Sequence, residues 1–372
     1  MVGIMRAAFA GSRSAGARTA IDPRPHPRRT TAFPSAFPVA IRLAFPLAIP
    51  LAFPVAFPLA FRRTGIAPTD PVRFAPCPNR MEHPARSGHH RHMAQPVVFS
   101  ADDFGLTPSV NEAVEQAHRH GILDAASLMV AAPAAADAVR RAHAMPGLRV
   151  GLHLVVIEGP AVSPASDIPD LVGPDGQFPS NQLGLGIDYF FRRSVRRQLA
   201  REIRAQFAAF AATGLPLDHA NAHKHMHLHP TVGRMMIEIG REFGLRSVRV
   251  PAEPPSVLAQ CGTTVGFGDR ALHGWTRLLR RQVRRAGLFT PDHCFGLAWS
   301  GHMTPDRIHN LLGVLPDGTS EIYFHPGVEQ DACLSHLMPD YEHSAELQTL
   351  LDRDGRIRAL LAGFASGRQS PG

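Results

Sequence analysis

The stretch Val97-Val-Phe-Ser-Ala-Asp-Asp-Phe-Gly105 decides the fold class of this chain. A short apolar run that ends in polar residues and a glycine is typical of a buried strand and the loop after it. Thr107 and Pro108 follow, ahead of apolar residues with helical spacing. We therefore expect a strand, a loop, and a helix that Thr107 caps and that has Pro108 in its first turn.

The alternation of strand and helix continues along the chain. We expect further strands at 127–132, 148–156, 218–225, 247–250, 294–299 and 321–325. We expect further helices at 134–144, 189–212, 231–243, 272–285, 305–312 and 344–361. About seven such units within 93–372 favour a distorted β/α barrel of the TIM type over an open sheet. The first strand lacks the Gly-x-Gly-x-x-Gly turn of dinucleotide-binding proteins, and no phosphate-binding Gly-x-x-x-x-Gly-Lys loop occurs.

Charge is distributed unevenly between the two parts of the chain. Residues 1–92 carry a net charge of +10, and residues 93–372 carry −2. The expected folded domain therefore lacks the net positive field that nucleic-acid binding requires. The four cysteines are far apart in sequence and form no Cys-x-x-Cys pair, which excludes a disulfide framework and a zinc ribbon.

Residues 1–92 have low complexity. Between 31 and 61 the unit Ala-Phe-Pro recurs, and its prolines disfavour a membrane-spanning helix in the apolar run 43–61. We interpret 1–92 as a disordered tail, or as lying upstream of a true start at Met93, and 93–372 as the catalytic domain. The alternative is a membrane-surface or targeting arm that carries Arg62, Arg63 and Arg73.

Polar residues that can bind a metal follow four of the expected strands. They are Asp102 and Asp103, then His153, then His219, His223, His225, His227 and His229, and finally His325. The carboxyl ends of the strands meet at one end of a β/α barrel, so one aspartate and two histidines can converge on one divalent metal ion. Side chains alternate along a strand, so the two adjacent aspartates point differently: one can bind the metal and the other can accept a proton from water.

Each of these signals also has a structural explanation. A lone Asp-Asp pair before a helix is more often a cap, and a lone histidine after a strand is more often a hydrogen-bonded core residue. The histidine row is harder to explain in this way, because a strand would bury several imidazoles that all need partners. The irregular insertion 158–186 carries apolar residues that either form a lid or an apolar surface for a lipid-linked substrate or pack against the rest of the domain. They are Leu171, Phe178, Leu183 and Leu185.

Four motifs stand at the strand ends, in the order Ala101-Asp-Asp-Phe-Gly105, Gly151-Leu-His-Leu154, His219 to Pro230, and Phe324-His-Pro326. Together they resemble the YdjC/ChbG family of carbohydrate deacetylases, over about residues 97–361. Asn221-Ala-His-Lys-His225 with Glu321-Ile-Tyr-Phe-His-Pro326 is similar to the branch associated with hopanoid biosynthesis.

The resemblance implies removal of an acetyl group from an N-acetylated amino sugar, which in that branch is carried on a hopanoid lipid. It implies one divalent metal ion, Mg²⁺ or Zn²⁺, held by Asp103, His153 and His223. It further implies Asp102 as the general base and His325 as the general acid.

Asn221-Ala222 departs from the family pattern, and Arg249 lies outside the four motifs. The wider family usually has Asp-Ser where this chain has Asn221-Ala222, which removes a carboxylate that could orient His223 or its neighbours. Arg249, at the end of its expected strand, is a candidate for binding the substrate or its oxyanion, with an ordinary ion pair as the alternative.

The expected partner is an N-acetylated amino sugar, soluble or lipid-linked, and nucleic acid is excluded. We expect a cytoplasmic protein, with contact at the inner face of the membrane as an open alternative, and the sequence leaves a homodimer open. Rival functions are a chitooligosaccharide deacetylase, another metal hydrolase such as a phosphoesterase, and a sugar- or metal-binding protein without activity.

Overall fold

The computed structural model describes residues 97–328 and 331–365. The predicted tail at 1–92 lies outside these residues, as does the alternative of a membrane-surface arm. Within the described part, the first strand and helix form as expected: the Thr107 side chain accepts a hydrogen bond from the Val110 N–H at 3.3 Å, and Pro108 opens the helix.

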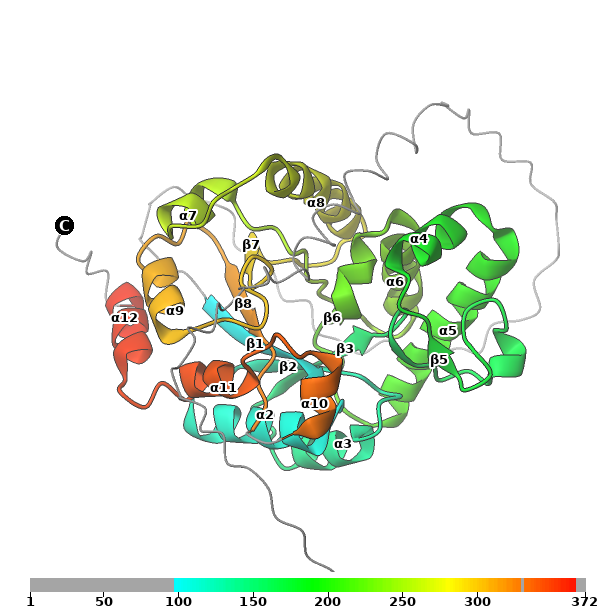
Figure 1. The fold of residues 1–372 in the computed structure, drawn as a ribbon, viewed down its shortest axis with the longest axis horizontal. Helices are drawn as coiled ribbons and strands as arrows, with labels where there is room; N and C mark the ends of the chain where they lie inside the picture. Colours follow the sequence, from blue (N-terminus) through cyan, green and yellow to red (C-terminus); the bar gives the residue numbers. More distant parts are fainter. Residues whose placement is uncertain (1–96, 329–330, 366–372) are drawn as a thin grey trace, which may run out of the picture. The chain divides into compact units, whose positions relative to one another are not determined.

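Six parallel strands form the central sheet, and neighbours follow the order β6-β3-β2-β1-β8-β7. The strands are β1 (Val97–Phe104), β2 (Ala125–Leu128), β3 (Arg149–Leu154), β6 (Ala220–Ala222), β7 (His293–Phe295) and β8 (Ser320–Phe324). Ser100, Ala101 and Phe104 of β1 are buried, because the sheet is covered on both faces. The sheet curls on itself, as Figure 1 shows.

The expected strand at 247–250 makes isolated bridges rather than a ladder. Val248 pairs with Ala220 of β6, and Ser247 pairs with Phe289. Pro251 has no N–H to continue the pairing, although the Ala252 carbonyl still accepts from Cys294 of β7 at 3.3 Å. This segment lies between the two edge strands of the six-stranded sheet, which confirms the expected distorted β/α barrel.

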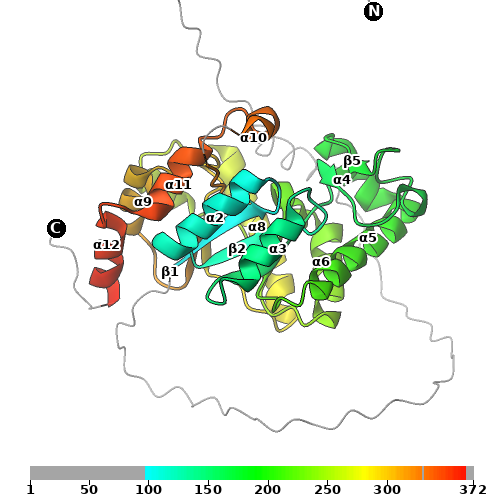
Figure 2. The same ribbon diagram turned by 90° about the horizontal axis from the view of Figure 1, so that it is seen from below.

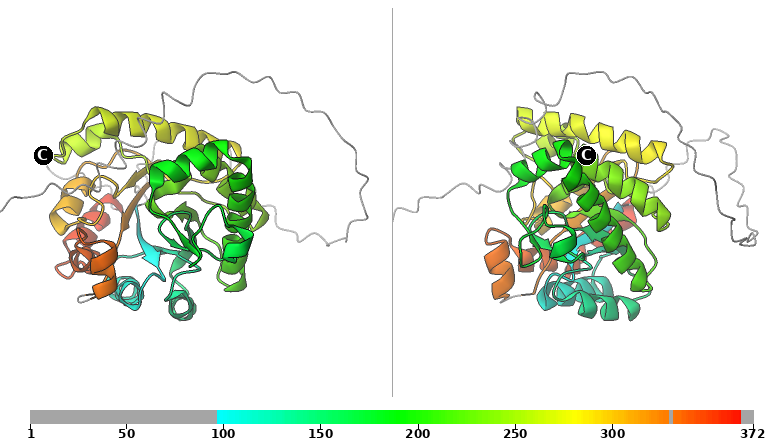
Figure 3. Two further views of the ribbon diagram at one scale, coloured as in Figure 1. Left: turned by 45° about the vertical axis from the view of Figure 1, so that its right-hand side comes forward. Right: turned by 90° about the vertical axis from the view of Figure 1, so that its right-hand side faces the viewer.

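Helices surround the curled sheet (Figure 1). They are α2 (Pro108–His120), α3 (Ala135–His143), α5 (Arg193–Ala212), α6 (Pro230–Glu242), α8 (Phe267–Arg285), α9 (Pro305–Leu312) and α11 (His343–Leu351). Each presents apolar residues to the core, and Figure 3 shows α8, in yellow-green, running beside α6 on the outside. Among the helices in 97–328 and 331–365, none combines the length and the apolar character that crossing a bilayer requires.

Short elements occupy the connections between these helices and strands. They are β4 (Gly159–Pro160), η1 (Ala165–Asp167), β5 (Gln177–Phe178), α4 (Gln182–Phe191), η2 (His223–Leu228), α7 (Pro255–Gln260), α10 (Ala332–Leu337) and α12 (Arg356–Ala365). Of the apolar residues in the insertion, Leu171, Phe178 and Leu185 are buried and contribute to packing, whereas Leu183 is 52% exposed.

Backbone conformation interrupts or ends three of the predicted elements early. The helix at 189–212 is interrupted at Arg192, whose backbone is extended, and the closing helix is interrupted at Asp352, which is left-handed. The predicted strand 218–225 was wrong beyond Ala222, because Lys224 and His225 have φ values of 50° and 53°. Left-handed residues cannot continue a strand, so the histidine row leaves the sheet there.

Candidate active site and metal cluster

Asp103, His153 and His223 come together at the carboxyl ends of β1, β3 and β6. The Asp103 Oδ1 atom lies 3.2 Å from the His153 Nε2 atom and 3.1 Å from the His223 Nδ1 atom. One donor atom from each residue falls within 4.8 Å of the other two. Asp103 and His153 are buried, and His223 is partly open. These are the three residues that the resemblance implied as metal ligands.

The backbone at the end of β1 separates the two neighbouring aspartates. Asp103 has a φ of 60°, and the pairing of β1 with β2 shifts register between Ala101 and Phe104. A non-glycine residue in the left-handed region is uncommon, and aspartate tolerates it better than most residues. The turn directs Asp103 to the histidines and leaves Asp102 to a different set of partners.

Asn221 of β6 orients His153. Its Nδ2 group donates to the Asp102 carboxylate at 2.9 Å and to the Ser127 hydroxyl at 3.0 Å, so its Oδ1 atom faces the His153 Nδ1 at 2.7 Å. The reverse amide orientation would place Oδ1 against the Asp102 carboxylate. His153 therefore carries a proton on Nδ1, which leaves Nε2 as the ring nitrogen that faces the cluster and that can bind a metal ion once it has lost its own proton. The amide at position 221 thus does the orienting that was expected of a carboxylate, although it acts on His153 rather than His223.

The other histidines of the row have structural partners. The His225 Nε2 atom lies 2.8 Å from the Tyr323 hydroxyl, and the His227 Nε2 group donates to the Arg249 carbonyl at 3.0 Å. Burial lowers the pKa of both rings, that of His227 to about 3, so both are neutral at pH 7. His229 accepts from the Thr231 N–H and caps α6.

His219 begins a chain of hydrogen bonds that ends at the site. Its Nδ1 atom faces Asp218, and its Nε2 atom lies 3.0 Å from the Ser127 hydroxyl, which in turn contacts Asn221. Gly151 of β3 allows the His219 ring to pack closely, because a Cβ there would lie 2.5 Å from it. Ser127 has no sequence signal beyond its place in a buried strand, so reasoning from the sequence missed it.

Arg249 is buried in contact with Asp102 and is not on the surface of the protein. Its side chain is 1% exposed, its Nη1 group donates to Asp102 at 2.5 Å, and Glu321 and the Ser100 hydroxyl accept its other donors at 2.8–2.9 Å. Of the two alternatives for Arg249, this position favours the ion pair over the substrate contact, because the guanidinium is enclosed by two carboxylates and holds Asp102 in place. Glu321 and Ser100 were not predicted as part of the site.

The site holds its carboxylates ionised. Burial alone would raise the pKa of Asp102, but Arg249, His153 and His325 hold it well below its usual range. Burial likewise opposes ionisation of Asp103, and His223 and His153 hold its pKa well below the ordinary value. Two buried, charged carboxylates beside two imidazoles are a fit for a divalent cation.

His325 follows β8 and lies beside the cluster. Its backbone N–H donates to the Glu346 carboxylate at 2.5 Å, and its ring lies edge-on to the Tyr341 ring with the centroids 5.1 Å apart. The ring Nδ1 atom is buried without a partner in the described residues. Burial lowers the pKa of His325 to about 4, while Asp103 and Asp102 oppose the shift.

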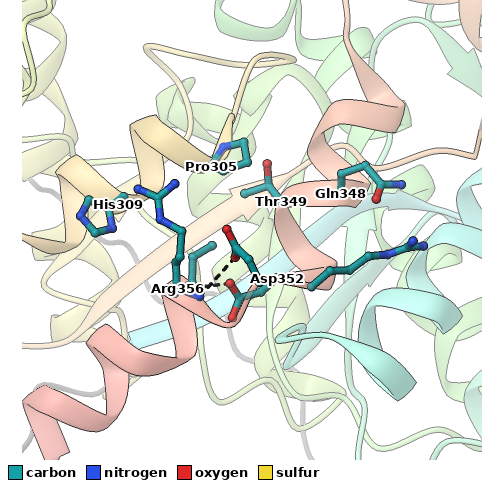
Figure 4. Close-up of a pocket in the computed structure, with 9 residues that line it drawn as sticks. Pro305, His309, Gln348, Thr349, Asp352 and Arg356 are labelled. Atoms are coloured by element: carbon teal, nitrogen blue, oxygen red, sulfur yellow. Dashed lines mark hydrogen bonds between the residues drawn. The ribbon is translucent and has the colours of Figure 1, made fainter.

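A cavity of about 260 Å³ lies elsewhere, among α9, α11 and α12 (Figure 4). None of the three candidate ligands lines it. The Asp352 carboxylate on its wall accepts from the N–H groups of Ile357 and Arg358 at 2.9 Å, so this group holds the start of α12. The cavity is therefore separate from the candidate site.

The family comparison accounts for almost all of the described chain. A family model described as YdjC-like protein matches residues 96–361. The chain belongs to the YdjC-like family. This match includes every residue placed in the site above, which confirms the resemblance seen in the four motifs.

Curated relatives of this YdjC-like chain are named carbohydrate deacetylases. The Brevibacillus brevis protein is 36% identical over 159 residues, which cover 43% of this chain and 59% of that protein. The Geobacillus stearothermophilus protein is 29% identical over 235 residues, which cover 63% and 80%. The chain thus spans about three-fifths of the length of the first relatives it matches.

A solved structure supports the fold of this YdjC-like chain. It is a crystal structure of an Enterococcus faecalis protein provisionally described as acting in cellobiose-phosphate cleavage. It aligns with a TM-score of 0.57 at 20% identity, over 73% of this chain and 95% of that one. At that identity the likeness concerns the arrangement of strands and helices alone.

Replacing Arg249 with methionine is expected to destabilise the YdjC-like domain strongly. The substitution leaves Asp102 and Glu321 buried without their shared cation, and breaking one side of a buried ion pair costs about 3–5 kcal/mol. Burial would then raise the pKa of Asp102. Urea unfolding of the unchanged protein and of the Arg249→Met variant measures the change in the free energy of unfolding.

The matched control is Arg204→Met, which breaks the exposed pair with Glu242. Solvent screens that pair, so the unfolding curve should hardly move. Equal changes in the free energy of unfolding for the two substitutions would show that the ion pairs of Arg249 stabilise the fold no more than an exposed ion pair does.

Proposed function

We propose that this protein is a metal-dependent hydrolase that removes the acetyl group from an N-acetylated amino sugar. The observation that carries the proposal is the cluster of Asp103, His153 and His223 beside a second ionised carboxylate, Asp102, which Arg249 supports from below. The names of the curated relatives support the same reaction.

The donor set fits a divalent metal ion. One carboxylate and two imidazoles leave coordination positions for water and substrate, which is typical of a catalytic rather than a structural site. Asp103, the His153 Nε2 atom and His223 would hold the ion, Zn²⁺ or Mg²⁺. When bound, such an ion supplies a Lewis acid that polarises a carbonyl and makes water more acidic.

Asp102 is suited to act as the base. Arg249 and the neighbouring imidazoles hold its pKa well below the ordinary range, so the carboxylate is ionised at neutral pH, the form that can accept a proton. The low pKa by itself makes it a weak base, so the role depends on the bound metal ion making the attacking water more acidic. Arg249 and Asn221 each donate one hydrogen bond to it, and these bonds fix its orientation. Arg249 is in this proposal a positioning residue.

His325 is suited to deliver a proton to the departing amine. A pKa of about 4 makes the ring neutral before the reaction. It must therefore first take up a proton, the one that the attacking water gives up to Asp102, and the charge of Asp102 and Asp103 favours its doing so. The ring then protonates the sugar nitrogen as the carbon–nitrogen bond breaks, which releases acetate and a free amine.

The finer proposal is that the amino sugar is carried on a hopanoid lipid. The similarity of the segments 221–225 and 321–326 to that branch supports it. The test measures acetate release from an N-acetylglucosaminyl hopanoid and from a soluble chitooligosaccharide. It uses the full chain before chelation, after chelation and after the metal is added back. The two substrates together test the proposed reaction and the proposed lipid-linked substrate.

Metal-dependent release from the lipid substrate supports both the reaction and the branch. Release from the soluble sugar alone would instead favour a chitooligosaccharide deacetylase. Absence of release from both, together with turnover of phosphate esters, would replace the proposed reaction by a phosphoesterase.

A further inference from the structure

Large apolar side chains are exposed at seven positions in the described part of the chain. They are Leu183, Ile187, Phe191, Phe267, Leu278, Phe289 and Leu337. Three of them lie in α4, one lies at the start of α8 and one lies in α10. Leu278 and Phe289 lie farther along α8 and after its end.

Contacts and chain order place these five residues around the end of the barrel that holds the site. Helices α4 and α8 both contact the turn η2, which carries His223: the Gln182 amide lies 3.7 Å from the Met226 sulfur, and the Trp275 Nε1 group donates to the Leu228 carbonyl at 2.9 Å. Helix α10 follows β8 and His325, so it belongs to the same end of the barrel. Figure 2 shows α4 and α10 along the same upper edge of the molecule. We call Leu183, Ile187, Phe191, Phe267 and Leu337 the apolar rim.

Helix α4 contributes a continuous stripe to the apolar rim. Leu183, Ile187 and Phe191 are spaced at i, i+4 and i+8, so they share one face over about 12 Å, and they are 52%, 52% and 64% exposed. The opposite face is fixed in place, because Leu185 and Tyr189 are buried and the Tyr189 hydroxyl donates to the Val156 carbonyl at 2.6 Å. The stripe is thus held outward by the packing of the inner face.

The stripe lies next to the turn that carries His223. The Gln182 amide at the start of α4 contacts the Met226 sulfur of η2 at 3.7 Å. Phe190 lies edge-on to His229, which ends the same turn, with 6.1 Å between the ring centroids. A surface that covered the stripe would therefore lie beside the site.

Positive charge flanks the stripe. Arg192 follows Phe191 and pairs with Asp170 and Asp188, whereas Arg193 and Arg197 in the first turns of α5 are exposed and have no acidic partner among the described residues. An apolar stripe with arginines at its border matches the interface of an anionic bilayer, where apolar groups enter the acyl boundary and cations meet the headgroups.

We propose that the apolar rim docks on the surface of an anionic lipid bilayer. This places the site end of the barrel against the headgroups, from which a lipid-linked amino sugar can reach the site without its lipid leaving the membrane. The inference deepens the proposed function and rests on it only for the identity of the substrate, since the docking surface is defined by the exposed residues themselves.

Cosedimentation of the full chain with vesicles tests the docking. The probes are vesicles of phosphatidylcholine with 30% phosphatidylglycerol and vesicles of phosphatidylcholine alone, both without acetylated sugar. We expect binding to the anionic vesicles, and the triple variant Leu183→Ser, Ile187→Ser, Phe191→Ser to lower the partition coefficient by about tenfold or more. The variant Arg193→Gln, Arg197→Gln should weaken binding to the anionic vesicles only.

The matched control is the variant Leu278→Ser, Phe289→Ser, which removes the two exposed apolar residues outside the rim and should bind as the unchanged chain does. Circular dichroism confirms that each variant is folded. Failure of the full chain to bind, equal binding by the triple variant, or loss of a dimer rather than of vesicle binding in that variant would overturn the proposal. Acetate release from the N-acetylglucosaminyl hopanoid and from the soluble chitooligosaccharide is measured separately, so absence of release from both would count against the proposed reaction and not against docking.

Discussion

His223→Ala is expected to lose the metal ion and, with it, nearly all acetate release. His223 contributes one of three donor atoms to the cluster, and it is the one that lies nearest to solvent. Loss of a supporting hydrogen bond around a metal typically costs about 10–100-fold in affinity, and loss of a ligand itself should cost more. We expect metal content after gel filtration to fall from about one ion per chain to a small fraction, and turnover to fall by at least about 10³-fold.

The control for this substitution is His229→Asn in the same segment. His229 caps α6 by accepting from the Thr231 N–H, and asparagine is also a good helix cap. This variant should retain both metal and turnover. Unchanged metal content in folded His223→Ala would remove His223 from the ligand set.

Asp102→Asn is expected to retain the metal and to lose most turnover. Asparagine has nearly the same shape as aspartate, and the cluster of Asp103, His153 and His223 is left intact. It cannot accept a proton from water, and loss of a general base typically costs about 10²–10⁴ in rate. A 10³-fold loss corresponds to about 4 kcal/mol of transition-state stabilisation. We expect kcat to fall by this amount while KM changes little.

A second variant distinguishes two effects of Asp102→Asn: the loss of the general base and the loss of one negative charge beside Arg249. Glu321→Gln neutralises the other carboxylate that contacts Arg249 and leaves Asp102 in place. Its turnover should stay within about tenfold of the unchanged chain, since Asp102 remains ionised beside the guanidinium. Near-normal kcat in Asp102→Asn would remove Asp102 from the base role, and equal losses in both variants would assign the effect to the charge of the network.

The two predictions separate metal binding from proton transfer, and the structure divides these two roles between the neighbouring residues Asp103 and Asp102. Asp102 and Asp103 are adjacent in sequence, yet the left-handed backbone at Asp103 directs one to Arg249 and the other to the histidines. The sequence argument from side-chain alternation predicts such a division, and the shift in register within β1 is the feature that produces it here.

Patterns in the sequence were sufficient to predict the fold and the convergence of the cluster. Apolar runs alternating with helical patterns predict parallel strands, because burial and hydrogen bonding impose a period of two on a strand and 3.6 on a helix. Parallel strands joined by helices must end on the same side, so polar residues after several strands must meet. Asp103 and His153 could therefore be expected near each other from local patterns alone.

The tertiary structure alone decided what surrounds these residues. Arg249 and Asp102 are 147 residues apart, and Asn221 and Asp102 are 119 apart, so no local pattern shows that they touch. The end of β6 at Ala222 depends on two left-handed residues whose side chains are held by Glu158 and Tyr323 from other segments. Periodicity records which face of an element is buried, whereas the partner across the core depends on how the whole chain packs. The strand ends that carry the candidate ligands were therefore predictable from the pattern, and the resemblance singled out Asp103, His153 and His223 among them. The contact of Arg249 with Asp102 was decided by the tertiary structure alone.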